Sequence, residues 1–283
     1  TAVYAGIQGS YSMIYAGIGS FVSVYLLAQG FSNSEIGLCV SIANLLAVFI
    51  QPGLANWADR SEKVKLTDII TGIGLFLLVV LLALFWAKGH TFWVFSLFVL
   101  ALAAHGVFQP FINALNQRFL KKGYAINFGL CRSVGSVGFA LVTGLLGSIV
   151  MIYGNQSILM ASLICLILLM ASNFMCHQLM KKEPNLSFYK EEMEEISLST
   201  FIRNNRTFLL LNLGVMLVFY HVNALGAFLF QMIQPIGGTE TDMGFLFALM
   251  AIVEVPSMIF YSRLQKQFGS KKMLVFSMMG FVL

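Results

Sequence analysis

Long apolar stretches alternate with short polar loops along the whole chain. An α-helix needs about 20 apolar residues to cross the hydrocarbon core of a bilayer, at a rise of about 1.5 Å per residue. Eight stretches reach this length, and a ninth begins near Met273 but stops at Leu283, too short to span. The pattern predicts an all-α polytopic membrane protein with spans at residues 3–28, 36–57, 66–87, 91–117, 125–149, 155–178, 207–233 and 243–262.

Composition supports the same class of protein. Hydrophobic residues make up 58% of the chain, charged residues only 10%, and the mean hydropathy is +0.84. Soluble domains carry about 25% charged residues. A chain with so few charges cannot cover itself with water-facing side chains, which excludes a soluble globular protein.

The distribution of charge predicts the orientation in the membrane. The net charge of +5 would suit nucleic acid, but 15 of the 17 Lys and Arg residues lie in alternate loops. The opposite loops carry only Lys88, together with acids such as Glu35. Basic loops stay on the cytoplasmic side. We therefore expect a multi-pass protein of the plasma (inner) membrane with a cytoplasmic N-terminus, and no nucleic-acid partner.

The order of spans and loops predicts two halves. Six spans occupy residues 1–178, a polar loop rich in both acids and bases follows at 179–206, and further spans occupy 207–283. Short basic turns follow the second span, at 53–66, and the eighth, at 261–274. Parallel repeats of six spans are a known transporter plan. We expect this sequence to be a piece of a longer protein, with about three further helices beyond it.

Two charged residues lie within predicted spans. Arg132 is about seven residues, roughly 10 Å at helical rise, from the start of the fifth span. Glu254 lies at a similar depth in the eighth span. A charged side chain at the centre of a bilayer is costly and most often marks a pathway for substrate or ions. The pattern predicts a functional site, with an ion pair that only joins two helices as the alternative.

Other spans carry polar stripes. His105, Gln109 and Asn113 follow one another at intervals of four and therefore share one helix face. His221 and Asn223 lie in the seventh span. Several helices that each turn a polar face inward indicate a wet central cavity, although each residue alone could simply bond a neighbouring helix. Further stripes are Tyr4, Gln8, Tyr11 and Tyr15 in the first span and Ser41, Asn44 and Gln51 in the second.

Small residues line the fifth and eighth spans. Between membrane helices, small residues let the backbones approach closely. We expect these two helices to meet closely and to rock against each other, with rigid packing as the alternative. The small residues are Gly135, Gly138, Gly144 and Gly147 in one span and Gly244, Ala248 and Ala251 in the other.

Motifs for catalysis are absent from this sequence. It contains no G-x-x-x-x-G-K-[ST] phosphate loop, no G-x-S-x-G elbow and no H-E-x-x-H zinc motif. We expect no enzymatic activity, no cofactor and no metal.

Three stretches carry a family resemblance, which extends over nearly the whole chain. The chain resembles the major facilitator superfamily, and within it the lactose permease group of oligosaccharide:proton symporters and its nucleoside-permease-like relatives. The resemblance implies two six-helix bundles, of which this sequence covers about eight and a half helices. The stretches are "YSMIYAGIGSFVSVYLLAQGFSNSEIGLCVSIANLLAVFIQPGLANWADR" (11–60), "FGLCRSVGSVGFALVTGLLG" (128–147) and "MGFLFALMAIVEVPSMIFYSRLQKQFGSKKML" (243–274).

The resemblance implies roles for individual residues. Arg132 matches an arginine that bonds substrate hydroxyls, and Phe139 matches an aromatic residue that lies against a sugar ring. Asp59 and Arg60 match a charged loop motif that latches the cytoplasmic side. Asn113 departs from the pattern, because the permease has a glutamate there.

Two further departures from the permease pattern are visible. Glu254 lies about one turn later than the permease's glutamate, and Ala55 and Glu62 replace glycines of the loop motif. The histidine and glutamate that carry the proton in the family lie on a tenth helix, beyond this sequence.

These observations predict a monomeric secondary transporter that imports a sugar or similar hydroxylated solute together with protons. Arg132, Asn113, Phe139, His105, Gln109 and His221 would bind the solute, and Glu254 would exchange a proton or pair with Arg132. The alternatives are a nucleoside or aromatic-acid carrier or a drug exporter of the same fold. A more remote alternative is a membrane sensor that does not transport.

Overall fold

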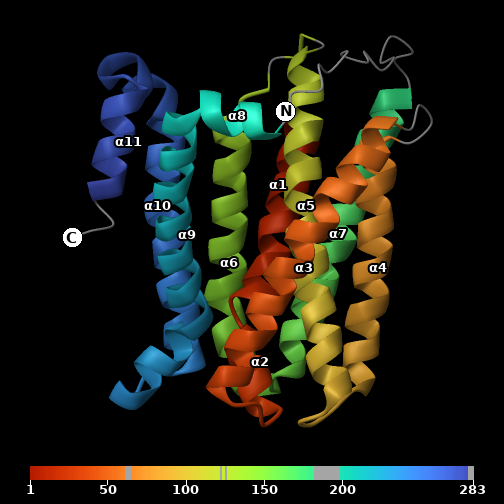
Figure 1. The fold of residues 1–283 in the computed structure, drawn as a ribbon. Coiled ribbons are helices and arrows are strands. Elements are labelled where there is room, and N and C mark those ends of the chain that lie inside the picture. The colour runs from red at the N-terminus through yellow and green to blue at the C-terminus, as the bar shows by residue number, and fades with distance from the viewer. Residues whose placement is uncertain (61–64, 122, 125, 182–197, 280–283) are drawn as a thin grey trace.

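The fold is known from a computed structural model that describes residues 1–283 except 61–64, 122, 125, 182–197 and 280–283. The described part consists of helices joined by short loops (Figure 1). The helices are α1 (Ala2–Ile14), the π-helix η1 (Tyr15–Gly19), α2 (Val22–Ala28), α3 (Asn33–Arg60), α4 (Leu66–Trp86), α5 (Phe92–Lys121), α6 (Phe128–Tyr153), α7 (Gln156–Lys181), α8 (Leu198–Asn204), α9 (Arg206–Ile233), the 3₁₀ turn η2 (Gln234–Ile236), α10 (Glu240–Phe268) and α11 (Ser270–Met279).

The predicted class is confirmed. In the described part of the chain, eight helical segments are long and apolar enough to cross a membrane, and each matches one predicted span. Most bounds agree within three residues, although α5 and α6 each continue four residues beyond the predicted ends and α10 continues six. The protein is therefore an all-α, multi-pass membrane protein.

The first span is a helix with a π-turn in its middle. The N–H of Ser20 bonds the carbonyl of Tyr15 at 2.9 Å, one residue further back than in an α-helix. Glycines make this turn possible: a Cβ at Gly17 would overlap the hydroxyl of Ser162 on α7, and one at Gly19 would overlap the ring of Tyr15. The glycines thus let the π-turn pack closely on α7 and on the ring of Tyr15.

A proline in α5 is compensated by the neighbouring helix. Pro110 has no N–H, so it cannot bond the carbonyl of Gly106 one turn earlier. The side-chain amide of Gln51, on α3, donates to that carbonyl at 3.1 Å. The close approach is possible because a Cβ at Gly106 would lie only 3.1 Å from Ala47. Gln51, one residue of the polar stripe predicted in the second span, therefore satisfies a backbone carbonyl of α5.

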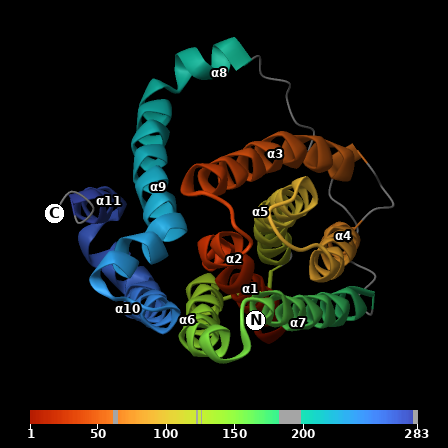
Figure 2. The ribbon, with the colours of Figure 1, turned by 90° about the horizontal axis from the view of Figure 1, so that it is seen from below.

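Helices α9, α10 and α11 lie together on one side of the bundle, and α1 to α7 occupy the other side (Figure 2). The two groups meet along α6 and α10, as the small residues predict. A Cβ at Gly147 would overlap the backbone of Glu240, and one at Gly244 would overlap the carbonyl of Thr143. At the other end of this contact, a Cβ at Gly129 would lie 2.8 Å from the carbonyl of Met258.

The prediction for the glycines of the fifth span is only partly right. Gly144 and Gly147 face α10, but Gly135 and Gly138 face α1. A Cβ at Gly135 would lie 2.8 Å from the hydroxyl of Ser12, and one at Gly138 would lie 2.6 Å from Met13. Residues 135 and 138 lie on the face of α6 opposite to residues 144 and 147. Glycines on α6 therefore allow two different helices, α1 and α10, to pack closely against it.

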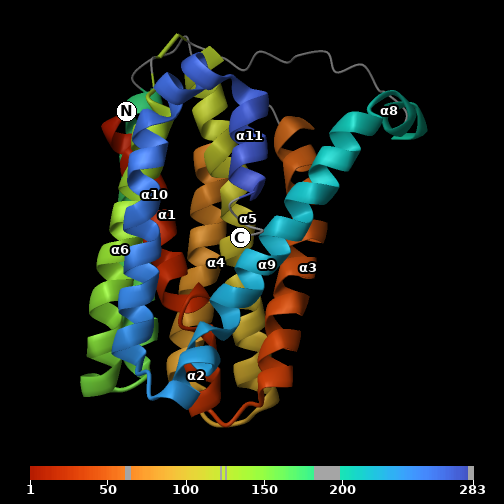
Figure 3. The same cartoon turned by 90° about the vertical axis from the view of Figure 1, so that its left-hand side faces the viewer.

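A second contact joins the groups at the end of the bundle far from the N-terminus. Figure 3 shows α9 running obliquely from α8 down to the region of α2 and α3. There the amide of Gln231 donates to the side-chain oxygen of Asn33 at 3.2 Å, and Gly37 lies against the ring of Phe228. The two groups are thus held together at this end as well as along α6 and α10.

Candidate functional site

A cavity of about 560 Å³ lies between the two groups of helices. Its walls come from the first span and from α3, α5, α6, α9 and α10. The polar and aromatic side chains among its lining residues are Tyr11, Ser12, Tyr15, Ser20, Asn44, His105, Gln109, Arg132, Ser136, Phe139, Phe219, Asn223, Phe247 and Glu254. Five of the seven residues predicted for solute binding or charge pairing are among them.

Arg132 and Glu254 both line this cavity. Arg132 forms no hydrogen bond or ion pair with any described residue, and its guanidinium and the Glu254 carboxylate do not form an ion pair here. A guanidinium carries five N–H donors. Its donors are therefore available to a ligand in the cavity.

Arg132 lies nearer the start of its helix than the sequence predicts. Asn127 caps α6 by accepting the N–H of Leu130 at 3.1 Å, so the helix begins at Phe128 rather than at 125. Arg132 is therefore four residues, about 6 Å along the axis, from the start of its helix. The charge lies towards the end of the cavity near the N-terminus, and the middle of the cavity is aromatic.

Aromatic rings from four helices form this middle region. The rings of Tyr11 and His105 stack with centroids 4.4 Å apart, and Tyr15 stacks on His105 at 5.3 Å. Tyr15 also stacks on Phe139 at 6.3 Å, and Phe139 meets Phe247 edge to face at 6.2 Å. This aromatic ladder crosses from α1 and α5 through α6 to α10. Sequence reasoning assigned Tyr11 and Tyr15 to a polar stripe, and Phe247 gave no signal.

His105 has a defined hydrogen-bonding role within the ladder. It is only 4% exposed, and its Nε2 lies 3.2 Å from the carbonyl oxygen of Tyr11. A carbonyl oxygen only accepts, so Nε2 carries the proton. The other ring nitrogen, Nδ1, has no partner among the described residues and can accept a bond from a ligand.

Two predicted binding residues do not line the cavity. Asn113 accepts a hydrogen bond from Gln109 at 3.3 Å, so it lies behind a residue that does line it. His221 is exposed and is absent from the lining, whereas Asn223 on the same helix is present. Residues two apart point about 200° apart around a helix, which explains why one faces inward and the other does not.

The predicted gating loop is described only in part. Arg60 is exposed at the end of α3. The side chain of Asp59 and residues 61–64 lie outside the described part of the structure. The latch implied by the resemblance therefore stays a prediction.

Comparison with known proteins agrees with the fold. A sequence profile of the MFS_1 like family matches residues 4–283. The "Uncharacterized transporter YwbF" of Bacillus subtilis (strain 168) is 25% identical over 289 residues, which cover 97% of this chain and 67% of that protein. No solved structure matches the chain. These matches do not single out the lactose permease group. Since the profile covers almost the whole sequence, the chain is a membrane transporter that belongs to the MFS_1 like family.

Proposed function

We propose that this transporter is a proton-coupled symporter for a sugar or a similar small hydroxylated solute. The observation that carries the proposal is the cavity between the two groups of helices, where an unpaired arginine lies beside an aromatic surface. Sites for small ligands combine apolar and aromatic walls with a few well-placed polar groups. A hydroxylated ring with one apolar face fits both features.

Arg132 would hold the solute. Its free N–H groups can bond two hydroxyl oxygens, and Nδ1 of His105 can accept a hydroxyl proton. Phe139, with its ring between Tyr15 and Phe247, would lie against the apolar face of the solute. Gln109 would add a further polar contact, held in place by its bond to Asn113.

Glu254 would provide the coupling to protons. It is the acid that lines the cavity, and it faces Arg132 there without forming an ion pair with it. When protonated, it loses its attraction for Arg132. When ionised, it competes with the solute for the guanidinium. Binding of solute and proton would therefore favour each other, as symport requires.

Alternating access would follow from motion of the two halves, residues 1–178 and 207–283, joined by the loop at 179–206. The contact of α6 with α10 and the contact near Asn33 and Gln231 are the surfaces that would slide or separate. In this proposal the basic loops and the N-terminus lie in the cytoplasm. The protein acts as a monomer in the plasma membrane. Asp59 and Arg60 hold the cytoplasmic side closed during part of the transport cycle.

One observation favours a second candidate, a carrier of a nucleoside or an aromatic acid. The ladder places three parallel rings, those of Tyr11, His105 and Tyr15, against the cavity. A flat aromatic solute could extend this stack. An amide at Asn113, where the permease has an acid, is also compatible with a different solute.

Transport by the full-length protein tests both candidates. The protein is reconstituted in vesicles with an imposed pH gradient, and uptake is measured for sugars, nucleosides, aromatic acids and cationic drugs. We expect Arg132→Ala and Glu254→Gln each to abolish gradient-driven accumulation. Arg263→Ala is the control, because Arg263 lies on α10 outside the cavity, over the ring of Phe260. Uptake at the wild-type level in both cavity variants would overturn the proposed site.

A further inference from the structure

A second hollow lies on the opposite side of α5 from the aromatic ladder, between α3, α4 and α5. Its volume is about 490 Å³, and nearly all of its lining is apolar. Helices α3 and α4 each pack on α5 (Figure 2), and residues of all three helices line the hollow. Two small residues of α5, Ala103 and Ala104, form its floor, so the space is not filled from within. We call this hollow the lateral crevice.

The lateral crevice opens to the surface of the bundle. Trp57 on α3 and Phe76 on α4 line it and are 52% and 47% exposed. A Cβ at Gly72, on the α4 wall, would meet no atom within 4 Å. All of these residues belong to membrane-spanning segments. The molecules that contact such a surface in a bilayer are lipids.

The shape of the lateral crevice suits an acyl chain. Its wall on α4 runs from Asp68 to Phe76, about 12 Å along the helix axis. The crevice therefore extends along the helices, and lipid tails in a bilayer also run across the membrane. A sheet-like or bulky polar ligand would not fill it.

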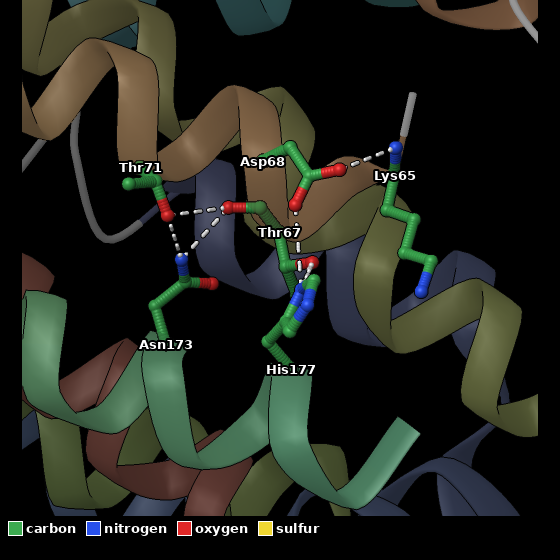
Figure 4. A network of polar contacts seen from close by, with 6 residues as sticks. All are labelled: Lys65, Thr67, Asp68, Thr71, Asn173 and His177. Atoms are coloured by element: carbon green, nitrogen blue, oxygen red, sulfur yellow. Dashed lines mark hydrogen bonds and ion pairs between the residues drawn. The ribbon is translucent and has the colours of Figure 1, made fainter. Parts of the chain in front are cut away.

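Charged residues mark one end of the lateral crevice. Asp68 lies there, but its carboxylate is already engaged: Oδ2 accepts the N–H of Lys65 at 3.1 Å, and Oδ1 lies 3.3 Å from Nδ1 of His177 (Figure 4). The same histidine nitrogen lies 2.9 Å from the hydroxyl of Thr67. The acid is thus held within a network between α4 and α7.

Two cations flank the same end. Lys65 precedes Asp68 by three residues at the start of α4, and Arg60 follows Trp57 by three residues at the end of α3. Neither side chain pairs with an acid among the described residues. Basic positions between membrane helices attract the headgroups of anionic lipids.

We propose that the lateral crevice binds one acyl chain of an anionic phospholipid, with its phosphate at Arg60 and Lys65. The crevice supplies the apolar contact and the two cations supply the preference for negative charge. This site is separate from the solute cavity, and its occupation does not depend on which solute is carried.

Tryptophan fluorescence tests the proposal, because Trp57 lines the lateral crevice. In the full-length protein, every other tryptophan is replaced by Phe. The protein is then reconstituted in phosphatidylcholine vesicles that contain increasing fractions of dibrominated phosphatidylglycerol or dibrominated phosphatidylcholine, whose bromines quench nearby indoles. We expect the anionic lipid to reach half-maximal quenching at a mole fraction lower by about fivefold or more, since a single Lys or Arg near an anionic surface strengthens the attraction by about fivefold.

Three variants locate the site. Gly72→Leu places a side chain in the open space of the crevice and should abolish the preference. Gly53→Leu is the matched control, because Gly53 on α3 also has no atom within 4 Å of its Cβ but does not line the crevice. Arg60→Gln combined with Lys65→Gln should remove the preference without filling the crevice. Gel filtration confirms that each variant is folded and monodisperse.

Two results would overturn the proposal. Equal quenching of Trp57 by the two brominated lipids would show that it faces bulk lipid without selecting a headgroup. A preference that survives Gly72→Leu would show that the anionic lipid binds outside the lateral crevice.

Discussion

Replacing Gly147 by alanine tests the contact between α6 and α10. The added Cβ would overlap the carbonyl of Glu240 and lie 2.9 Å from Cα of Thr241. Carbon atoms pack at about 3.5–4.0 Å, so the helices must separate locally by at least about 0.6 Å. The obstructing atoms are backbone and cannot rotate away. Overpacking of this kind costs about 1–3 kcal/mol.

Gly144→Ala is the matched control on the same face of α6. Its Cβ would lie 3.5 Å from the Cβ of Ala248, which is an ordinary contact. Both changes gain the same helix propensity, about 1 kcal/mol, so the difference between them isolates the clash. We expect Gly147→Ala to melt about 2–6 °C below Gly144→Ala.

The melting midpoint can be followed with a thiol-reactive dye on purified full-length protein. Cys39, Cys131, Cys165 and Cys176 are all buried and unpaired in this structure, so they react only on unfolding. If Gly147→Ala melts at or above Gly144→Ala, the close approach of α6 and α10 described here is wrong.

Three further changes test individual hydrogen bonds. Gln51→Ala leaves the carbonyl of Gly106 without a donor, and we expect a loss of about 1 kcal/mol in the same melting assay. Asn173→Leu removes the bonds from its amide to the carbonyl of Thr67 (2.8 Å) and to the hydroxyl of Thr71 (2.9 Å), with a similar expected loss. His105→Phe keeps the stacked rings but removes both ring nitrogens, including the bond to the carbonyl of Tyr11, so we expect a loss of about 1 kcal/mol in the melting assay and an apparent KM for uptake raised by up to about tenfold.

Each of these changes has a control of the same type. Gln265→Ala removes an exposed bond to Ser270, and Asn212→Leu removes an exposed bond within α9. His90→Phe changes an exposed histidine that pairs with Glu35 outside the cavity. Equal effects in test and control variants would contradict the assigned contacts. An unchanged KM in His105→Phe would remove His105 from the binding site.

The spans were predictable because each element of this fold must be apolar over its full length. Hydropathy alone located all eight. The start of α6 was less predictable, because it depends on a side-chain cap at Asn127 rather than on hydropathy. That shift of three residues places Arg132 closer to the start of its helix than predicted. A small error in a boundary thus becomes an error of several ångströms in a site.

The composition of the cavity was predictable only in part. His105 and Gln109 share a helix face, and the structure places both in the lining. The choice between His221 and Asn223 could not be made, because α9 is largely apolar around its whole circumference and its inward face is set only by packing. The ladder could not be foreseen either, since it depends on contacts between residues as distant in sequence as Tyr15 and Phe139.

The π-turn at Tyr15–Gly19 fixes the rotational phase of the first span. A π-turn accommodates one residue more than an α-helical turn. Each residue after it is therefore rotated by about 100° around the axis, compared with its position in a regular α-helix. Deleting one residue from this turn would restore a regular α-helix, but it would swing the face of α2 away from its partners on α9. The length of this turn is therefore a constraint in its own right. In homologous chains that gain or lose one residue here, different side chains of α2 would have to form the contact with α9 at this end of the bundle.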